Sequence, residues 1–356
     1  NGRLVLILST HVDDLKYAGE EWARKKLVAE LEKQFEAMKL SEGDFEHCGV
    51  QHRQDSSTME ITVDQTHYAA QLRPMAEDHL SRSDPDKEVD TETHETFRSL
   101  LGGVAWLVQT RPDIAVYVQA LQRRMSKPRA IDVISLNRVL RYIKRKPLYL
   151  RFKAIDRPLS LVVISDSAFQ SKEQDCLALR SGIIALASAS PLDGNWQVQP
   201  LEFVCKKQNH VCRSTYAAEL HSALDLSGLA MLIQSTLTEV MGGALGVTRL
   251  LEAHLAGKHL VPMHLFLDAK AVFDSVTATN VKTPADKILL LHALALRNQL
   301  ELNQISTLNW IDTRDMVADG LNKGCIDRTA IRDFFQHGKW KMAHYATWKF
   351  WRFGAN

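Results

Sequence analysis

The second half of the chain constrains the fold most, because apolar runs alternate there with helix patterns in a fixed order. Short apolar runs bounded by turn residues are typical of buried strands, whereas longer segments with helical spacing predict helices. The order is three strands (159–164, 182–187, 201–205), a helix (215–237, capped by Ser214 or Thr215), a strand (264–268), a helix starting near 284, a strand (305–311) and a short helix (317–321). This series predicts an α/β sandwich.

Four acidic residues lie at the ends or early turns of these elements. Asp166 closes the first strand and Asp268 closes the fourth. Glu219 lies early in the long helix, and Asp319 lies on the last short helix. A buried strand that ends in a carboxylate carries a desolvation cost unless a cation or a donor compensates it. Two Mg²⁺ ions about 4 Å apart would do so and would bind both oxygens of a phosphodiester displacement.

The simpler interpretation of each acid is structural. A single Asp at a strand end is usually a turn cap, and a lone Glu in the first turns of a helix usually interacts with the helix dipole. The order strand, helix, strand, helix favours a metal site, but spacing alone leaves both interpretations open.

The first half predicts smaller elements. An Asp-Asp pair, Asp13 and Asp14, lies at the tip of a predicted hairpin. A helical block runs from Phe97 to about Lys146, where Pro147 ends it. The other predictions are hairpin strands at 4–8 and 15–18, an amphipathic helix at 21–39, a strand at 61–63, a helix at 68–76 and an acidic loop at 81–92.

The charge is unevenly distributed, although the whole chain has a formal charge of only +2. Residues 123–157 hold twelve basic and two acidic residues, whereas residues 77–95 hold eight acids and two bases. A solvated face is the simpler interpretation of the basic segment. Contact with nucleic-acid phosphates is the alternative, with Arg138, Arg141 and Arg145 on one helical face as the preferred contacts.

Cysteine and histidine spacing gives no strong signal. The five cysteines form no CxxC pair, which argues against a secreted disulfide framework. Cys205, His210 and Cys212 are close in sequence, but without a second pair we interpret them as core or surface residues. His47 and His52 have no ligand spacing, nor has His67, and we assign them no role.

Three features concern the rest of the chain and its ends. No apolar run approaches the roughly 18 residues that a membrane span needs. The chain opens without Met inside a strand pattern, so we expect a fragment of a longer protein. The aromatic and basic residues of 339–353 are compatible with base stacking or membrane contact, but we prefer either packing back onto the domain or a poorly ordered end.

Several of these segments together resemble the Pol polyprotein of copia-type LTR retrotransposons. In the first half they are residues 11–15 (HVDDL), 97–103 (FRSLLGG), 110–115 (TRPDIA) and 138–144 (RVLRYIK). In the second half they are 165–169 (SDSAF), 214–220 (STYAAEL), 267–272 (LDAKAV) and 317–323 (VADGLNK). The resemblance covers nearly the whole chain, and its most specific part is the ordered series of four acidic positions.

The resemblance implies an α/β (α+β) fold. Its main part is an RNase H-like mixed five-stranded sheet with flanking helices, which follows a partial reverse-transcriptase palm and a helical thumb or connection region. The domains it implies are a partial palm (1–80), a basic helical connection (81–157), an RNase H-like domain (158–325) and a basic aromatic tail (326–356).

The activity implied is hydrolysis of the RNA strand of RNA–DNA hybrids with Mg²⁺ or Mn²⁺. By resemblance Asp166, Glu219, Asp268 and Asp319 are the catalytic metal ligands, and Asp13 and Asp14 are polymerase metal ligands. Lys206, Lys207 and Arg213, in an expected loop from 206 to 214, would contact a nucleic-acid backbone. The expected partners are the hybrid and the rest of the Pol polyprotein, with no membrane and no small-molecule cofactor. The expected location is intracellular, in cytoplasmic virus-like particles or in the nucleus.

The chain also departs from the family pattern. His11 replaces the usual Tyr, Phe169 stands where Trp is common, and Ala269 stands where Asn is common. The first polymerase Asp motif would lie before residue 1, so we expect no DNA polymerase activity from this chain. The main alternative is a catalytically inactive, nucleic-acid-binding remnant, and a weaker one is a DNA-cutting recombinase of the same general fold.

Overall fold

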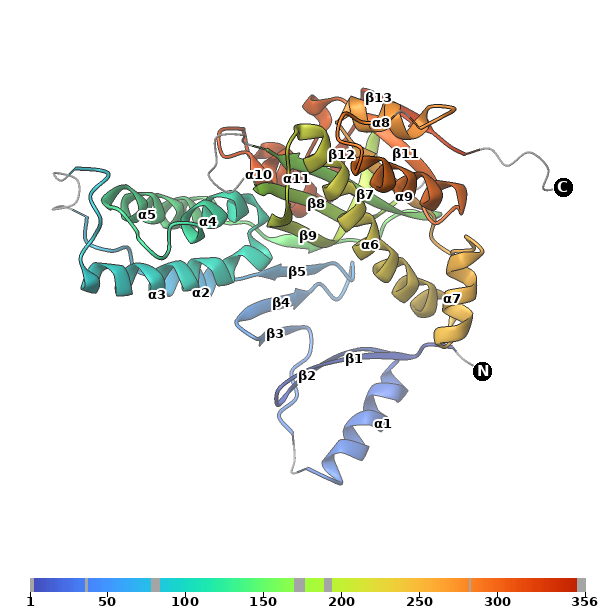
Figure 1. Cartoon of the computed structure of the whole chain (residues 1–356). Helices are drawn as coiled ribbons and strands as arrows, with labels where there is room; N and C mark the ends of the chain where they lie inside the picture. The colour runs from blue at the N-terminus through green and yellow to red at the C-terminus, as the bar shows by residue number, and fades with distance from the viewer. Residues whose placement is uncertain are drawn as a thin grey trace.

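The computed structural model describes residues 3–35, 38–77, 84–169, 177–188, 194–281 and 283–350, and it has a mixed α/β fold with three sheets. Figure 1 shows the large sheet and its helices on the right, a helical block on the left and an N-terminal hairpin with its helix below. No helix in the described ranges is long and apolar enough to cross a membrane.

The large sheet contains the strands predicted for the second half. Three strands, β7 (Leu159–Ala168), β8 (Leu177–Ser188) and β9 (Asn195–Val211), form an antiparallel meander. Next to β7, β10 (Met263–Leu267) and β11 (Thr307–Ile311) run parallel to it. The edge strands are β12 (Lys339–Lys341) on β9 and β13 (Tyr345–Trp348) on β11, which gives the order β12-β9-β8-β7-β10-β11-β13.

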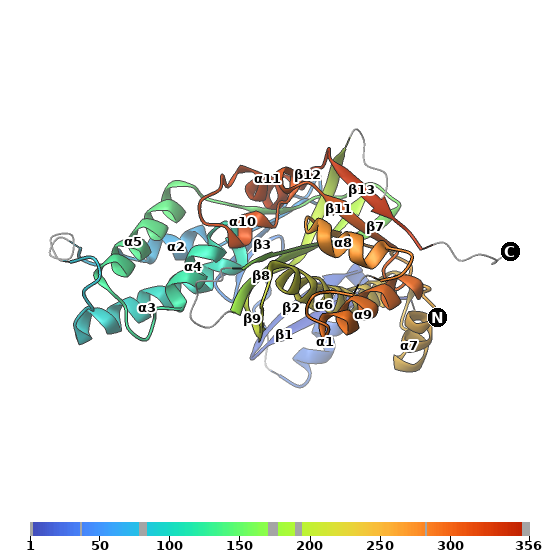
Figure 2. The ribbon, with the colours of Figure 1, turned by 45° about the horizontal axis from the view of Figure 1, so that its top comes forward.

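Helices cover both faces of this sheet, as Figure 2 shows. Leu161 and Val163 of β7 pack on one face against α6 (Thr215–Gly242), α8 (Lys270–Thr277) and α9 (Leu289–Glu301). Val162 and Ile164 pack on the other face with α10 (Asp319–Asn322) and α11 (Thr329–His337). Successive side chains of a strand point to opposite faces, so a strand that is covered on both sides needs an unbroken apolar run. Residues 161–164 of β7 form such a run.

A close approach of α6 to the sheet depends on Gly182 of β8. A Cβ atom at this position would lie 2.1 Å from Leu226 Cδ1 of α6 and 2.8 Å from the carbonyl oxygen of Ile164. Gly182 pairs with Ser165 in the sheet, one residue before Asp166. The glycine therefore sets the distance between α6 and the end of β7 that carries Asp166.

The helical block has its own core and an internal ion-pair cluster. Arg111 donates two hydrogen bonds to the fully buried carboxylate of Asp113, both at 2.9 Å, and Arg332 of α11 lies 3.2 Å from the same carboxylate. This cluster links the block to α11. The block consists of α3 (Thr91–Leu107), η1 (Val108–Thr110), η2 (Pro112–Ile114), α4 (Ala115–Gln122) and α5 (Ala130–Arg145).

The N-terminal part contains the predicted hairpin and a second, smaller sheet. In the hairpin, β1 (Leu6–His11) pairs with β2 (Asp14–Gly19), as predicted. The smaller sheet contains β3 (Asp44–His47), β4 (Val50–Gln54), β5 (Ile61–Asp64) and β6 (Leu150–Phe152), all antiparallel. Two short helices, α1 (Glu21–Glu32) and α2 (Thr66–Gln71), accompany these strands.

Several predicted boundaries are wrong. The helix at 21–39 ends at Glu32, and the helix at 68–76 ends at Gln71 because Pro74 follows closely. The expected loop from residue 206 is instead the end of β9, since residues 206 and 207 pair with β8. The helix expected near 284 begins at Leu289, while α7 (Val247–Leu255), α8, β3, β4 and β6 were not predicted.

The C-terminal segment packs back onto the domain, as preferred from the sequence. Trp340 of β12 is buried, and the Arg297 guanidinium lies 4.6 Å from the ring centre of Trp348 in β13. Residues 351–353 of the aromatic tail and residues 81–83 of the acidic loop lie outside the described ranges.

Candidate active site

The structure brings three of the four predicted acids together. Asp166 is part of β7, and Asp268 directly follows β10, the parallel neighbour of β7. Glu219 lies in the second turn of α6. Carboxylate oxygens of Asp166, Glu219 and Asp268 all lie within 4.8 Å of one another.

The fourth acid, Asp319, joins this cluster through Lys323. The Lys323 ammonium forms an ion pair with Asp319 and lies 3.8 Å from Asp166 Oδ2. Asn322 donates a hydrogen bond of 2.8 Å to the same Asp166 oxygen. The short helix α10 therefore presents one acid, one base and one amide to Asp166.

Hydrogen bonds from neighbouring elements fix the backbone of the cluster. Ser222, one turn after Glu219 on α6, donates to the carbonyl oxygen of Asp166 at 2.9 Å. The Trp310 indole donates to the Asp268 carbonyl oxygen at 2.9 Å, and Thr313 donates to Asp268 Oδ2 at 2.9 Å. These bonds hold β7, α6 and β11 in fixed positions around the carboxylates.

Burial and mutual repulsion shift the acids toward their protonated forms. Desolvation, followed by the charges of Asp166 and Asp268, raises the pKa of Glu219 well above its ordinary value. Desolvation and the charge of Asp166 also raise the pKa of Asp268, and they raise the pKa of Asp319 to about 7. Strongly perturbed carboxylates gathered at one place are typical of functional sites.

One atom of the cluster has no partner within the part of the chain that the structure describes. Glu219 Oε2 is buried and receives no hydrogen bond there. An unpaired buried carboxylate oxygen costs about 1–3 kcal/mol or more. A divalent cation with hard oxygen ligands would compensate this oxygen and reduce the repulsion, so the donor set fits Mg²⁺ or Mn²⁺.

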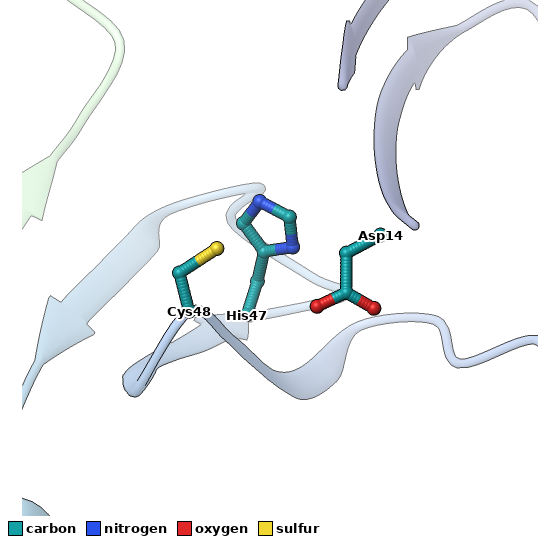
Figure 3. A group of neighbouring side chains, drawn as sticks. All are labelled: Asp14, His47 and Cys48. Atoms are coloured by element: carbon teal, nitrogen blue, oxygen red, sulfur yellow. The ribbon is translucent and has the colours of Figure 1, made fainter. Parts of the chain in front are cut away.

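The two acids of the N-terminal hairpin have a different environment. Asp13 is exposed in the turn between β1 and β2. Asp14 begins β2, and its carboxylate lies beside His47 and Cys48, within 4.8 Å, as Figure 3 shows. Among the described residues, neither acid belongs to a group of three or more potential metal ligands that contains a second carboxylate.

The predicted nucleic-acid contacts differ in availability. Arg138 and Arg145 of α5 are exposed, whereas Arg141 forms an ion pair of 2.8 Å with Glu77. Lys206 is exposed and Lys207 is half-buried, both on β9. Arg213 is exposed, and its guanidinium lies 3.9 Å from Asp286.

Sequence reasoning missed the residues that support the carboxylates. Lys323 and Asn322 are the last two residues of the VADGLNK segment, and Thr313 lies six residues before Asp319. Their closeness to Asp319 in sequence is the only signal that would have suggested a role. No spacing rule indicates that Ser222 reaches the Asp166 carbonyl.

The fold and this cluster define a mixed α/β protein with a carboxylate-rich site of the kind that binds divalent metal ions. Two retrovirus-related Pol polyproteins of Arabidopsis thaliana, from transposons RE1 and RE2, are each 27% identical to the chain over 238 residues. The match covers 67% of this chain and 14% of each polyprotein. An uncharacterised mitochondrial protein of the same plant is 46% identical over 48 residues, which is 14% of this chain and 20% of that protein.

These relatives confirm the resemblance to retrotransposon Pol polyproteins, of which the chain spans about one seventh of the length. No protein-family model matches the chain.

Proposed function

We propose that this chain is a Pol-derived, divalent-metal-dependent ribonuclease that hydrolyses the RNA strand of RNA–DNA hybrids. One observation carries the proposal: Asp166, Glu219 and Asp268 come from separate elements, yet their oxygens lie within 4.8 Å of one another. Asp319 adds a fourth acid through Lys323.

The strand order supports an RNase H-like fold for this part of the chain. Strands β9-β8-β7-β10-β11 form a mixed five-stranded sheet, with an antiparallel meander followed by two strands parallel to β7. Asp166 lies near the end of β7 and Asp268 directly follows β10, and between these two strands the pairing changes from antiparallel to parallel. The two edge strands β12 and β13 extend this arrangement.

The side chains divide the chemistry between them. When bound, Mg²⁺ supplies a Lewis acid and a water of lowered pKa for the attack on a phosphodiester. Asp166, Glu219 and Asp268 would hold it, and Asp166 is oriented by Asn322. Asp319, whose pKa is raised to about 7, is able to accept and return a proton near neutral pH.

Exposed basic side chains supply a surface for the hybrid backbone. Arg138 and Arg145 on α5 and Lys206 on β9 are exposed to solvent. Cations in this arrangement neutralise phosphates without reading the base sequence. We therefore expect binding that weakens as the salt concentration rises and that does not depend on the base sequence.

The test is cleavage of a hybrid with labelled RNA, with Mg²⁺ present, by the full chain and by Asp166→Asn. Asp274→Asn is the matched control, because Asp274 is a half-buried acid on α8 that pairs with Lys270 and lies outside the carboxylate cluster. The proposal expects cleavage by the parent and by the control, and a loss on the order of 10³-fold or more in Asp166→Asn. Equal cleavage by parent and Asp166→Asn, or none by the parent, would contradict it.

A second candidate function is hybrid binding without hydrolysis. It is favoured by Lys323, which already places a cation beside Asp166 and Asp319. This remnant would bind a hybrid in a salt-sensitive manner and leave the RNA intact at every Mg²⁺ or Mn²⁺ concentration. Cleavage that stops when EDTA is added would exclude it.

A further inference from the structure

Three side chains outside the proposed active site face one another in the N-terminal part. Asp14 begins β2, His47 ends β3, and Cys48 lies in the turn that follows. One ligand atom from each lies within 4.8 Å of the other two. Figure 3 shows the His47 ring between the Cys48 sulfur and the Asp14 carboxylate. We propose that Asp14, His47 and Cys48 bind a zinc ion.

The turn between β3 and β4 explains how two consecutive residues share one site. His47 pairs with Val50, so Cys48 and Gly49 form a two-residue turn, and both have positive φ, at 52° and 71°. In a regular strand, consecutive side chains point to opposite faces. The left-handed conformation of Cys48 turns its thiol toward the side of the His47 ring.

The residue type at this turn position is itself unusual. Two-residue hairpin turns with positive φ at both positions favour Asn-Gly or Asp-Gly, because these residues tolerate that conformation. A cysteine gains nothing locally from a left-handed backbone. A metal–thiolate bond would compensate the strain.

The three side chains are also available for coordination. Within the described ranges, none of them makes a side-chain hydrogen bond or an ion pair, and His47 has only a ring contact with His52, with centres 6.4 Å apart. The nearby Lys16 ammonium lies 3.4 Å from His52 Nε2. Asp14 is exposed and the other two are half-buried, so solvent reaches the cluster.

The donor set selects the metal. Sulfur, nitrogen and carboxylate oxygen together suit Zn²⁺, whereas Mg²⁺ prefers oxygen ligands alone. Tetrahedral zinc, with bonds of about 2.0–2.3 Å, places ligand atoms about 3.5 Å apart, so side-chain rotations that close the cluster by about 1 Å are sufficient. Water would take the fourth position, and the thiol proton of Cys48 would pass to solvent as the zinc–sulfur bond forms.

This site would connect two hairpins that meet there. Asp14 belongs to the β1–β2 hairpin, and His47 and Cys48 belong to the β3–β4 hairpin. A bound ion would therefore hold the N-terminal hairpin against the smaller sheet. The site shares no residue with the carboxylate cluster around Asp166, so its failure in a test would leave the proposed nuclease activity untouched.

The experiment is a titration of the metal-free full chain with Co²⁺ as a spectroscopic substitute for zinc. A thiolate ligand gives a sulfur-to-cobalt charge-transfer band in the near ultraviolet, which a carboxylate site does not give. We expect the band to reach its maximum at one equivalent of Co²⁺ and to disappear when Zn²⁺ displaces the cobalt. Cys48→Ser should abolish the band, and His47→Ala should weaken binding by at least about 10–100-fold, since even outer-shell changes cost that much.

The controls are an exposed cysteine outside the cluster and the neighbouring acid. Cys325→Ser and Asp13→Asn should retain the band, because neither residue belongs to the cluster. A titration without a thiolate band, or a band that persists in Cys48→Ser, overturns the proposal. If Cys48→Ser does not fold, X-ray absorption at the zinc edge of the zinc-loaded parent decides the question. The proposal expects one sulfur ligand on the zinc ion, and a zinc ion with no sulfur ligand overturns it.

Discussion

The charge of Asp319 in the proposed active site should oppose folding, and this effect can be measured. Desolvation and the charge of Asp166 raise the pKa of the Asp319 carboxyl from an ordinary 3.8 to about 7. Between these pH values the folded chain holds a proton that the unfolded chain has released. The contribution of Asp319 to stability must therefore fall as pH rises from about 4 to 7, and it stays low above that range.

The size of this effect follows from the shift. About three pKa units at roughly 1.4 kcal/mol each set a ceiling of about 4 kcal/mol at pH 8. Solvent screening and the loss of the Lys323 ion pair in the variant lower the net gain. We therefore expect Asp319→Asn to stabilise the metal-free chain by about 2 kcal/mol at pH 8 and by almost nothing at pH 4.

Urea unfolding in EDTA at pH 4, 6 and 8 measures this difference, with Asp274→Asn as the control for an acid outside the cluster. Mg²⁺ should stabilise both proteins at pH 8, because the three acids that would hold it are present in both, and a ligand at 100 times its dissociation constant contributes about 2.7 kcal/mol. The electrostatic reasoning would be refuted if Asp319→Asn raised the free energy of unfolding equally at every pH, or if it lowered that free energy at pH 8 in EDTA.

Three further variants test other parts of the structure. Asp113→Asn should destabilise the chain by about 3–5 kcal/mol in urea unfolding, since it breaks a buried ion pair; a loss below about 1 kcal/mol would be incompatible with that role. Arg138→Ala and Arg145→Ala should each reduce the slope of log K for hybrid binding against log salt concentration by about one, as measured by fluorescence anisotropy. Arg141→Ala should change this slope less, because Arg141 is already ion-paired with Glu77. Gly182→Ala should cost about 1–3 kcal/mol in thermal unfolding, because its Cβ would lie 2.1 Å from a leucine of α6; unchanged stability would disprove the tight approach.

The central strands β7 and β8 were predictable because they are buried on both faces. Residues 161–164 are apolar throughout, and the structure places the whole predicted strand, 159–164, inside β7. The end of β9 was not predictable, because Lys206 and Lys207 are polar and extend the strand only through pairing with β8. Long-range pairing overrides local composition there.

The candidate sites could also be predicted from the sequence only in part. The order of Asp166, Glu219, Asp268 and Asp319 along the chain predicted four acids. The pairing of β7 with β10 and the packing of α6 bring three of them within 4.8 Å of one another. His47 was assigned no role, because ligand spacing rules consider separation along the chain. Its approach to Asp14 depends on how two hairpins meet and on a left-handed turn, which no local pattern encodes.

The most direct test of the central claim is the Mg²⁺ dependence of RNA cleavage in a hybrid by the full chain, compared with Glu219→Gln. Glu219 carries the buried unpaired oxygen of the cluster, and glutamine keeps its shape but removes the charge. The account predicts cleavage that begins with added Mg²⁺, is confined to the RNA strand and is lost in Glu219→Gln. Cleavage that continues in the variant, or an intact RNA strand with the parent at every Mg²⁺ and Mn²⁺ concentration, would contradict it.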